Sequence, residues 1–342
     1  MTIRVGINGF GRMGRLGLRA AYEQLSKKVS NHPYQIVHIN ETSCNAECSA
    51  HLLAFDSLHG PWEKNVEAKE NTINISGASI GYSMMNELDV QKLRELNLDI
   101  IVDCTGVHRS PELLKPYFEA GIKKVVVSAP IKGGGLNMVV GVNEHLYDPG
   151  THHMISPASC TTNCVAPAIK VLHEEIGIER GTFTTIHDVT NTQVVIDTGH
   201  KDLRRARANS MSLIPTSTNS AKAIIQIFPD LKGRLHSIAI RVPVLNASLC
   251  DCVFEMKRNT TAEEINRLLE TASMTGMKGI LGYEIRPLVS VDYLNDTRSG
   301  IVDGLTTKVI QGNLVKLLIW YDNEIGYVHR MMELVEKVAT SM

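Results

Sequence analysis

Residues 3–14 read IRVGINGFGRMG, and this stretch decides the fold of the first part of the chain. It joins a short apolar run to the pattern G-x-G-x-x-G at residues 9–14, and a segment with the apolar spacing of a helix follows. In such a strand–turn–helix unit, Gly9 permits a tight turn, Gly11 lets the backbone approach a pyrophosphate, and Gly14 lets helix and strand pack closely. The amides that begin the helix then suit binding of phosphate groups.

An acidic residue supports the same interpretation. Residues 35–40 (QIVHIN) predict a second strand, and Glu41 follows it directly. A carboxylate at this position would accept hydrogen bonds from an adenosine ribose and repel a 2′-phosphate, so it favours NAD over NADP. The alternative is an ordinary solvated glutamate after a strand. We therefore predict an N-terminal Rossmann dinucleotide-binding domain that takes NAD.

The sequence beyond this unit shows two different patterns of predicted helices and strands. Up to residue 159, apolar strands (99–104 and 124–129) alternate with helical segments (90–96 and 112–120), which predicts a parallel sheet covered on both faces. Beyond residue 159 the pattern predicts an α+β catalytic domain with a mostly antiparallel sheet. Its expected helices are residues 162–175 and 261–272, and its expected strands are 181–187, 236–243, 248–257, 288–293, 307–310 and 314–320. A final amphipathic helix is expected over residues 328–338.

Composition argues against several other classes of protein. The formal net charge of −1 gives no long-range field that would favour nucleic acid or an anionic membrane. The chain has no apolar stretch of about 18 residues and no signal-peptide pattern at its start, so we expect no membrane insertion. We expect the 7 cysteines to be free thiols in a reducing cytoplasm, and their spacing predicts no metal site.

A candidate nucleophile lies in residues 156–164, SPASCTTNC. Cys160 stands at the start of a predicted helix, where the helix dipole and free amides lower the pKa of a thiol. The thiolate that results is the strong nucleophile. His187 ends a predicted strand, and its imidazole could stabilise the thiolate and transfer a proton. Taken singly, a buried structural cysteine and a structural histidine are the alternative interpretation.

Short motifs occur along the whole chain in a characteristic order. They are NGFGRMG at residues 8–14, SAP at 128–130, SCTTNC at 159–164, HKDLRRAR at 200–207, RVP at 241–243 and WYDNE at 320–324. Together they resemble the glyceraldehyde-3-phosphate dehydrogenase family. The resemblance implies that Cys160 attacks an aldehyde, that the thiohemiacetal gives a hydride to NAD, and that an anion releases the thioester. It also implies that His187 transfers the proton and that the Cys160 amide stabilises the oxyanion.

The resemblance further implies the residues that contact the cofactor and the anions. The cofactor set is Gly9, Phe10, Gly11, Arg12, Met13, Gly14, Glu41, Thr105, Ser128, Asn323 and Tyr327, in which Asn323 would hold the nicotinamide carboxamide and Tyr327 would pack near the ring. Thr190 and Arg241 match the site for the substrate phosphate, and Ser159, Thr161, Thr218, Asn219 and one of Arg204 and Arg205 match the site for the attacking anion. Hydroxyls and guanidinium groups suit tetrahedral oxyanions because they supply several directed donors. Asn219 stands where the family usually has glycine, so the site for the attacking anion departs here from the family pattern.

Four segments resemble one bacterial branch of the family, which is associated with arsenate resistance. They are residues 52–62, 143–153, 187–193 and 279–292. This resemblance implies arsenate as the acyl acceptor in place of inorganic phosphate, with 1-arseno-3-phosphoglycerate as product. Erythrose-4-phosphate dehydrogenase is the alternative, which Glu41, the DLRR segment and residues 301–304 also fit. A non-catalytic NAD-binding regulatory protein is a third hypothesis, against which the intact Cys160 and His187 pair argues.

The resemblance also implies the domain limits and the assembly. We expect an NAD-binding domain over residues 1–159, a catalytic domain over 160–322, and a C-terminal segment, 323–342, that returns to the first domain. The polar residues 197–212 resemble the S-shaped loop through which subunits of the family pack, and an ordered loop of this length usually has a function. We therefore predict a homotetramer.

Overall fold

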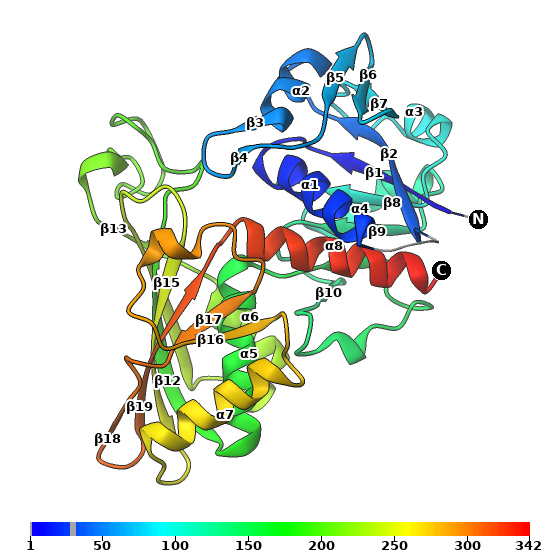
Figure 1. Cartoon of the computed structure of the whole chain (residues 1–342). Coiled ribbons are helices and arrows are strands. Elements are labelled where there is room, and N and C mark those ends of the chain that lie inside the picture. The colour runs from blue at the N-terminus through cyan, green and yellow to red at the C-terminus, as the bar shows by residue number, and fades with distance from the viewer. Residues whose placement is uncertain (1, 28–31) are drawn as a thin grey trace. The chain divides into compact units, whose positions relative to one another are not determined.

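The computed structural model describes residues 2–27 and 32–342, and the chain divides into two compact units (Figure 1). Unit 1 consists of Met1–Val140, Glu144–Ala158 and Val328–Met342, and unit 2 consists of Gly141–Asn143 and Ser159–Tyr327. The divisions differ slightly from the expected ones, because Ser159 and residues 323–327 lie in unit 2. Ser159 caps the first helix of that unit, and Asn323 accepts a hydrogen bond from Ser248 of the same unit.

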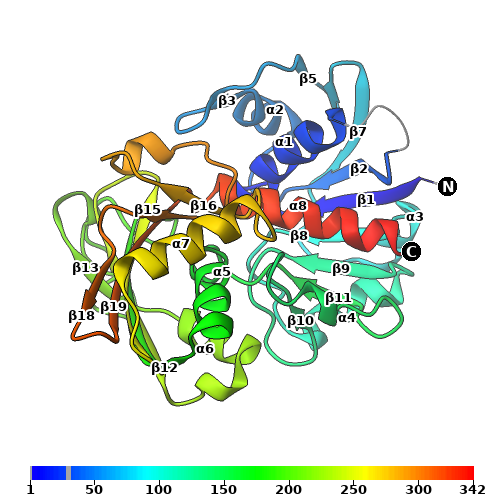
Figure 2. The same ribbon diagram turned by 60° about the horizontal axis from the view of Figure 1, so that its bottom comes forward.

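Unit 1 is built on a nine-stranded sheet in the order β10-β11-β9-β8-β1-β2-β7-β6-β5. Its strands are β1 (Ile3–Asn8), β2 (Tyr34–Asn40), β5 (Val66–Lys69), β6 (Thr72–Ile75), β7 (Ala78–Ser83), β8 (Ile100–Asp103), β9 (Lys124–Val127), β10 (Leu136–Asn137) and β11 (Met154–Ser156). The strands from β10 to β7 are parallel, and only β6 and β5 are antiparallel to their neighbours. Figure 2 shows β2, β1, β8 and β9 side by side. This is the doubly wound arrangement expected of a Rossmann domain.

Helices and short elements complete unit 1. They are α1 (Arg12–Ser26), α2 (Ala46–Ala54), α3 (Val90–Glu95), α4 (Pro111–Glu119), the 3-10 helix η1 (Glu144–Leu146), most of α8 (Ile325–Thr340), and the small ribbon of β3 (Phe55–Asp56) and β4 (Gly60–Pro61). Glycine allows two neighbouring elements to pack closely against α1. A Cβ on Gly14 would collide with the carbonyl oxygen of Gly9, and a Cβ on Gly17 would lie 2.7 Å from Cε of Met331 in α8. The turn after β1 and the C-terminal helix therefore both pack closely against α1.

Unit 2 contains an eight-stranded, mostly antiparallel sheet in the order β13-β14-β12-β15-β19-β17-β16, with β18 paired to β19. Its strands are β12 (Ile178–His187), β13 (Ile214–Ser217), β14 (Leu235–Arg241), β15 (Ser248–Met256), β16 (Leu281–Glu284), β17 (Gly300–Asp303), β18 (Lys308–Ile310) and β19 (Leu314–Tyr321). Its helices are α5 (Cys160–Glu175), α6 (Ser220–Ile227), α7 (Ala262–Met274) and the 3-10 turns η2 (Asn209–Met211), η3 (Pro229–Leu231) and η4 (Ser290–Tyr293). The fold class predicted from the sequence is thus confirmed for both units.

One predicted strand is wrong. Residues 288–293 were expected to be extended, but Ser290–Tyr293 form η4. The Asp292 carboxylate accepts a hydrogen bond from the Val289 amide at 2.8 Å, which closes the turn. The Tyr293 ring stacks on Trp320 with ring centroids 5.3 Å apart. A local cap and an aromatic contact across the fold therefore outweigh the β-propensity of this valine-rich segment.

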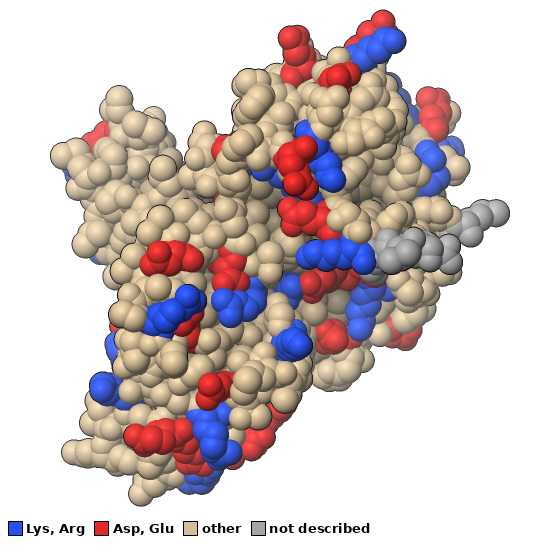
Figure 3. All heavy atoms as spheres, viewed as in Figure 1, with Lys and Arg blue, Asp and Glu red and all other residues tan. Residues whose placement is uncertain are grey.

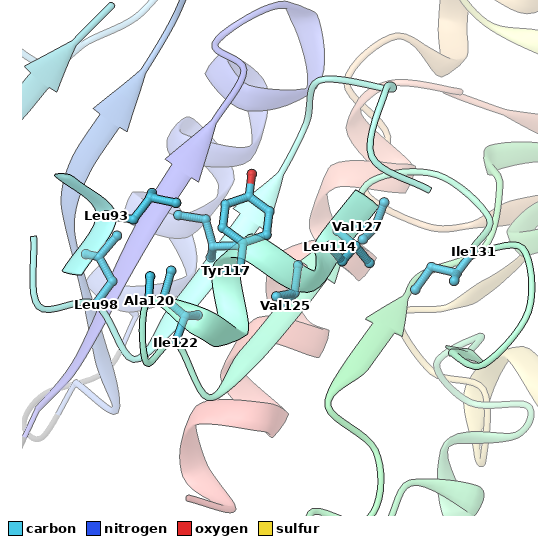
Figure 4. Packing of buried hydrophobic residues seen from close by; sticks show 10 residues of the cluster. Leu93, Leu98, Leu114, Tyr117, Ala120, Ile122, Val125, Val127 and Ile131 are labelled. Atoms are coloured by element: carbon cyan, nitrogen blue, oxygen red, sulfur yellow. The ribbon is translucent and has the colours of Figure 1, made fainter. Parts of the chain in front are cut away.

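The core of unit 1 includes a cluster between the sheet and helices α3 and α4 (Figure 4). Its buried members are Leu93, Leu98, Ile101, Leu114, Tyr117, Ala120, Ile122, Val125, Val127 and Ile131. At the molecular surface, basic and acidic side chains are intermingled over each unit on the face shown in Figure 3. Within the described ranges, no helix combines the length and the apolar character needed to cross a bilayer.

Two neighbouring leucines of α4 test this packing. Leu114 is fully buried in the cluster, whereas Leu113 is 47% exposed. Replacing Leu114 by Ala removes buried methyl groups and leaves a cavity, so we expect a loss of about 2–5 kcal/mol in the free energy of unfolding. Leu113→Ala is the matched control and should cost less than about 0.5 kcal/mol. Denaturant unfolding of the two variants measures the difference, and equal losses would contradict the packing described here.

Candidate active site

The first helix of unit 2 presents the candidate nucleophile. Cys160 is the first residue of α5, and Ser159 is its N-cap, whose Oγ accepts a hydrogen bond from the Thr162 amide at 3.2 Å. The Asn163 side chain donates to the carbonyl oxygen of Ser159 at 2.9 Å, which holds the entry to the helix. The amides of the first helical turn have no partner within the helix, so they leave a partial positive charge beside the sulfur.

Strand register brings the basic groups together. β12 ends at His187, its parallel neighbour β14 ends at Arg241, and these two residues are register partners. The Cys160 Sγ lies 3.7 Å from Nε2 of His187. The other ring nitrogen, Nδ1, lies 2.8 Å from Nη1 of Arg241. One imidazole therefore lies between the thiol and a guanidinium group.

Charge determines the protonation of this pair. Burial alone would raise the pKa of Cys160, but the hydrogen bond and the charge of His187 outweigh it and lower that pKa below its usual value. Burial alone would lower the pKa of His187, but Asp188 and Cys160 raise it to about 9. These opposite shifts favour a thiolate beside an imidazolium. Such a thiolate is a nucleophile that needs no further base.

Tyr321 closes the inner side of the pair. Its ring stands edge-on to the His187 ring, with centroids 6.0 Å apart. Its hydroxyl lies 3.0 Å from Oγ1 of Thr161 and 2.7 Å from Oγ1 of Thr185. Thr161 was predicted to contact an anion, but its hydroxyl points into the core and has Tyr321 as a hydrogen-bond partner there.

The predicted anion residues are placed at different depths. Arg241 is largely buried, and burial lowers the pKa of its guanidinium group. The positive charge of Arg205 also acts on Arg241, whereas the Arg204 side chain is exposed. Of the arginine pair, Arg205 is therefore the residue whose charge reaches Arg241. Thr190 lies in a turn, where its hydroxyl donates to Oε1 of Gln193 at 2.9 Å.

Thr218 and Asn219 lie where β13 gives way to α6. The Thr218 Oγ1 accepts a hydrogen bond from the Ser220 amide at 3.3 Å. Asn219 is the N-cap of α6 with φ −99° and ψ 10°, and its side chain makes no capping hydrogen bond. This backbone conformation is open to any L-residue. The tolerance of asparagine for left-handed geometry is therefore not needed here.

The dinucleotide turn in unit 1 fits a bound pyrophosphate. A Cβ built on Gly11 would meet no atom within 4 Å, so a side chain there would fill the open space in front of α1. Arg12 forms an ion pair with Asp56, and the Phe10 amide donates to Oε2 of Glu41 at 2.6 Å. The residues of this turn therefore leave room for a ligand at a helix N-terminus, as a dinucleotide requires. Met13 lies in the first turn of the same helix.

Glu41 is held as an anion. Its Oε1 accepts hydrogen bonds from the amides of Thr42 and Ser43 at 2.8 and 2.9 Å. Although burial opposes ionisation, these bonds and the one from Phe10 lower the pKa of the carboxyl group. A carboxylate oxygen can accept more than one hydrogen bond, so Oε2 keeps capacity for a ribose hydroxyl.

Two further predicted cofactor residues have side chains that are engaged within unit 1. The Thr105 hydroxyl donates to Oδ1 of Asp103 at 2.6 Å and accepts from the Val107 amide at 3.1 Å. The hydroxyl of Ser128 interacts with the thiol of Cys104. Both residues support the loops that follow the carboxyl ends of β8 and β9.

The two remaining predicted cofactor residues, Asn323 and Tyr327, lie in unit 2. Asn323 accepts a hydrogen bond from Oγ of Ser248 at 3.0 Å through its side-chain oxygen. Its side-chain NH2 group carries two hydrogen-bond donors, which suits a residue that presents NH2 to a ligand. Tyr327 is buried at the start of α8.

Sequence reasoning missed two buried carboxylates. Asp188 lies 2.6 Å from Nδ1 of His187, and its position next to a candidate base in the sequence was an available signal. Asp103 ends β8, and its carboxylate has as partners Asn8, Thr105, His108 and Tyr117. These four residues are spread over 110 positions of the sequence, so no local pattern predicts the network. Within the described ranges, no group of three or more His, Cys, Asp or Glu side chains is arranged to hold a metal ion.

Comparison with known proteins shows similarity to glyceraldehyde-3-phosphate dehydrogenases along the chain. Residues 3–111 match the family model for the NAD binding domain of glyceraldehyde 3-phosphate dehydrogenase, and residues 159–323 match the model for its C-terminal domain. Glyceraldehyde-3-phosphate dehydrogenase 3 of Nostoc sp. is 54% identical to this chain over 100% of both proteins. Glyceraldehyde-3-phosphate dehydrogenase 2 of Bacillus subtilis is 46% identical over 100% of this chain and 98% of its own length. The enzyme of Geobacillus stearothermophilus is 45% identical over 99% of both.

The cysteines offer a test that separates ionisation from exposure. Cys48 is exposed, but a hydrogen bond with Cys44 raises the pKa of its thiol. Cys160 is less exposed, and the pKa of its thiol is lowered. At about pH 7, iodoacetamide should therefore modify Cys160 faster than Cys48, because the thiolate is the reacting form. Peptide mapping by mass spectrometry after brief alkylation measures the order, and faster labelling of Cys48 would contradict the ion-pair assignment.

Proposed function

This chain belongs to the glyceraldehyde-3-phosphate dehydrogenase family, and from that membership we propose that it oxidises glyceraldehyde 3-phosphate through a thioester on Cys160. The observation that carries the proposal is the contact of the Cys160 thiol with the buried His187 at 3.7 Å. Both residues lie in the part of the chain that matches the C-terminal domain of the family. The match to the family's NAD binding domain gives the cofactor.

The protein groups account for the steps at the aldehyde carbon. The Cys160 thiolate attacks the carbonyl carbon, and the oxygen takes the proton that Nε2 of His187 carries, which gives a thiohemiacetal. The neutral imidazole then accepts the hydroxyl proton again as the carbon loses its hydride, and a thioester remains. NAD, when bound, supplies the hydride acceptor. The amide of Cys160 at the start of α5 supports the charge that develops on the oxygen.

The cationic groups of unit 2 suit the two anions of the proposed reaction. We assign the substrate phosphate to Arg241 and Thr190, and the attacking anion to Arg205, Thr218 and the amides around Ser159 and Thr161. Arginine supplies paired donors that match tetrahedral oxyanions. The buried Nε of Arg241, which has no hydrogen-bond partner among the described residues, supports a ligand at this guanidinium group.

The acyl acceptor is proposed to be phosphate or, as in the arsenate-resistance branch, arsenate that yields 1-arseno-3-phosphoglycerate. Arsenate and phosphate carry the same charge and have nearly the same shape, so one anion site can serve both. The ordinary backbone geometry of Asn219 is compatible with an amide that faces such an anion. Use of phosphate corresponds to a glycolytic role and use of arsenate to a resistance role. NAD and free thiols suit a cytoplasmic location.

The alternative functions have less support. Residues 301–304, which were weighed for erythrose-4-phosphate dehydrogenase, belong to the buried strand β17 and its end. They are core residues, so they give no indication of the substrate. The paired Cys160 and His187 argue against a non-catalytic regulatory protein, because a binding protein has no need of an ionised buried thiol.

The proposed homotetramer is supported by apolar side chains exposed around residues 195–213. Val195, Ile196, Leu203, Met211 and Leu213 are all at least 70% exposed. A cluster of large apolar side chains in one loop region is typical of a surface that another protein chain covers. We infer that this loop region packs against a second copy of the chain.

Activity with defined acceptors tests the proposed function. We expect NADH formation from glyceraldehyde 3-phosphate in the presence of phosphate or arsenate, and none from Cys160→Ser because the thioester cannot form. Cys48→Ser is the matched control and should keep wild-type turnover. Absence of turnover with NAD still bound would contradict the dehydrogenase. Faster oxidation of erythrose 4-phosphate without any added anion would replace the acceptor assignment by the alternative enzyme.

Light scattering at micromolar concentration tests the assembly. The wild type should have four times the mass of the 37.7 kDa chain, and the double variant Ile196→Asp with Leu203→Asp should form smaller species because it places charge on the buried surface. Met274→Asp, at an exposed position of α7, is the control and should keep the larger mass. A monomeric wild type would refute the tetramer.

A further inference from the structure

We propose that Asp188 is a positioning residue that holds His187 with Nδ1 toward its own carboxylate and Nε2 toward Cys160. This role rests on the proposed function, since it assigns a third member to the pair that performs the chemistry. The side chains of His187 and Asp188 are both almost fully buried, and the carboxylate Oδ1 lies 2.6 Å from Nδ1. The carbonyl oxygen of the same aspartate lies 3.0 Å from Nδ1. One residue therefore offers two acceptors to one ring nitrogen.

The backbone of Asp188 is itself fixed. Its amide donates to Oγ of Ser248 at 3.1 Å, and this hydroxyl donates to Oδ1 of Asn323 at 3.0 Å. The chain of hydrogen bonds anchors the turn after β12 to β15 and to the end of β19. The carboxylate consequently meets the imidazole from a defined position, as a positioning group must.

The buried oxygen of Asp188 requires a positive partner. Within the described part of the chain, its Oδ1 has no hydrogen-bond donor with good alignment. A buried carboxylate without compensation is costly, so it stabilises whatever cation lies beside it. At 2.6 Å that cation is the imidazolium of His187. The carboxylate thus favours transfer of the thiol proton to the imidazole.

Three other groups face His187, and their effects differ in sign. The Cys160 thiolate favours the imidazolium, whereas the Arg241 guanidinium opposes it. Arg241 Nη1 lies 2.8 Å from Nδ1, but it also donates to the carbonyl oxygen of Asp188 at 3.2 Å, which gives it another acceptor. The Tyr321 ring lies edge-on, and the pKa of its hydroxyl is raised by burial, so it stays neutral. Asp188 is therefore the one carboxylate among these groups.

Removing the charge of Asp188 should shift the pH at which His187 loses its proton, and the direction of that shift can be measured. With Asp188 present, the imidazolium of the ion pair keeps its proton to about pH 9. Without the Asp188 carboxylate, His187 loses its proton at lower pH for two reasons. The imidazolium is no longer stabilised by a neighbouring negative charge. The thiolate that remains beside the neutral imidazole is no longer repelled by the carboxylate. The thiolate then exists unpaired from that lower pH upward. An unpaired thiolate is more basic and reacts faster with a neutral alkylating agent.

The test is the pH dependence of alkylation of Cys160 by iodoacetamide, followed without NAD or substrate. The wild type should show a plateau at neutral pH and a second rise near pH 9, as His187 loses its proton. In Asp188→Asn the second rise should move down by about one pH unit or more. With substrate, kcat should fall about tenfold while the KM for NAD stays within about twofold.

Matched variants keep the result interpretable. Asp251→Asn removes a carboxylate that pairs with Lys316 elsewhere on the sheet of unit 2, and it should leave the wild-type profile unchanged. Asp188→Ser removes the same charge in a smaller side chain and provides the measurement if the asparagine variant does not fold. A second rise that stays near pH 9 in either folded Asp188 variant would overturn the role of Asp188. Failure of the dehydrogenase proposal would instead appear as a wild type without turnover, which leaves the alkylation profile readable.

Discussion

The candidate active site depends on one contact, in which the Cys160 thiol lies 3.7 Å from the imidazole of His187. Burial disfavours either charge alone. The two opposite charges stabilise each other, and the Asp188 carboxylate further stabilises the imidazolium. The shift of the His187 pKa from 6.5 to about 9 corresponds to about 3 kcal/mol of preference for the imidazolium. This preference is what allows a cysteine to act as a nucleophile at neutral pH.

The architecture of unit 2 serves to hold this pair. α5 fixes Cys160 at a helix start, where the amides support negative charge. The parallel register of β12 and β14 places His187 beside Arg241, and Tyr321 from β19 closes the inner side. Three elements distant in the sequence thus converge on one sulfur atom. In unit 1, the turn after β1 leaves an open space at α1 and a carboxylate at Glu41, which suits the dinucleotide.

The sequence was sufficient for those features whose signals are local. The glycine pattern at residues 9–14, the helix start at Cys160 and the alternating strands of unit 2 each follow from neighbouring residues, and so does the fold class. Features that depend on contacts across the fold were not predictable. Residues 288–293 form η4 because Tyr293 stacks on Trp320, and the Thr161 hydroxyl turns inward because Tyr321 lies there. The role of Asp188 could be recognised only from its distance to the His187 imidazole, and a sequence does not contain distances.

During turnover, the acyl group of the substrate should reside on Cys160. The most direct measurement is mass spectrometry of the protein quenched in acid after mixing with NAD and glyceraldehyde 3-phosphate without an acceptor anion. We expect one acyl adduct per chain, located by peptide mapping on the segment that contains Cys160. The adduct should be removed when phosphate or arsenate is added before the quench. NADH formation without any adduct, or with an adduct on another cysteine, would contradict this expectation.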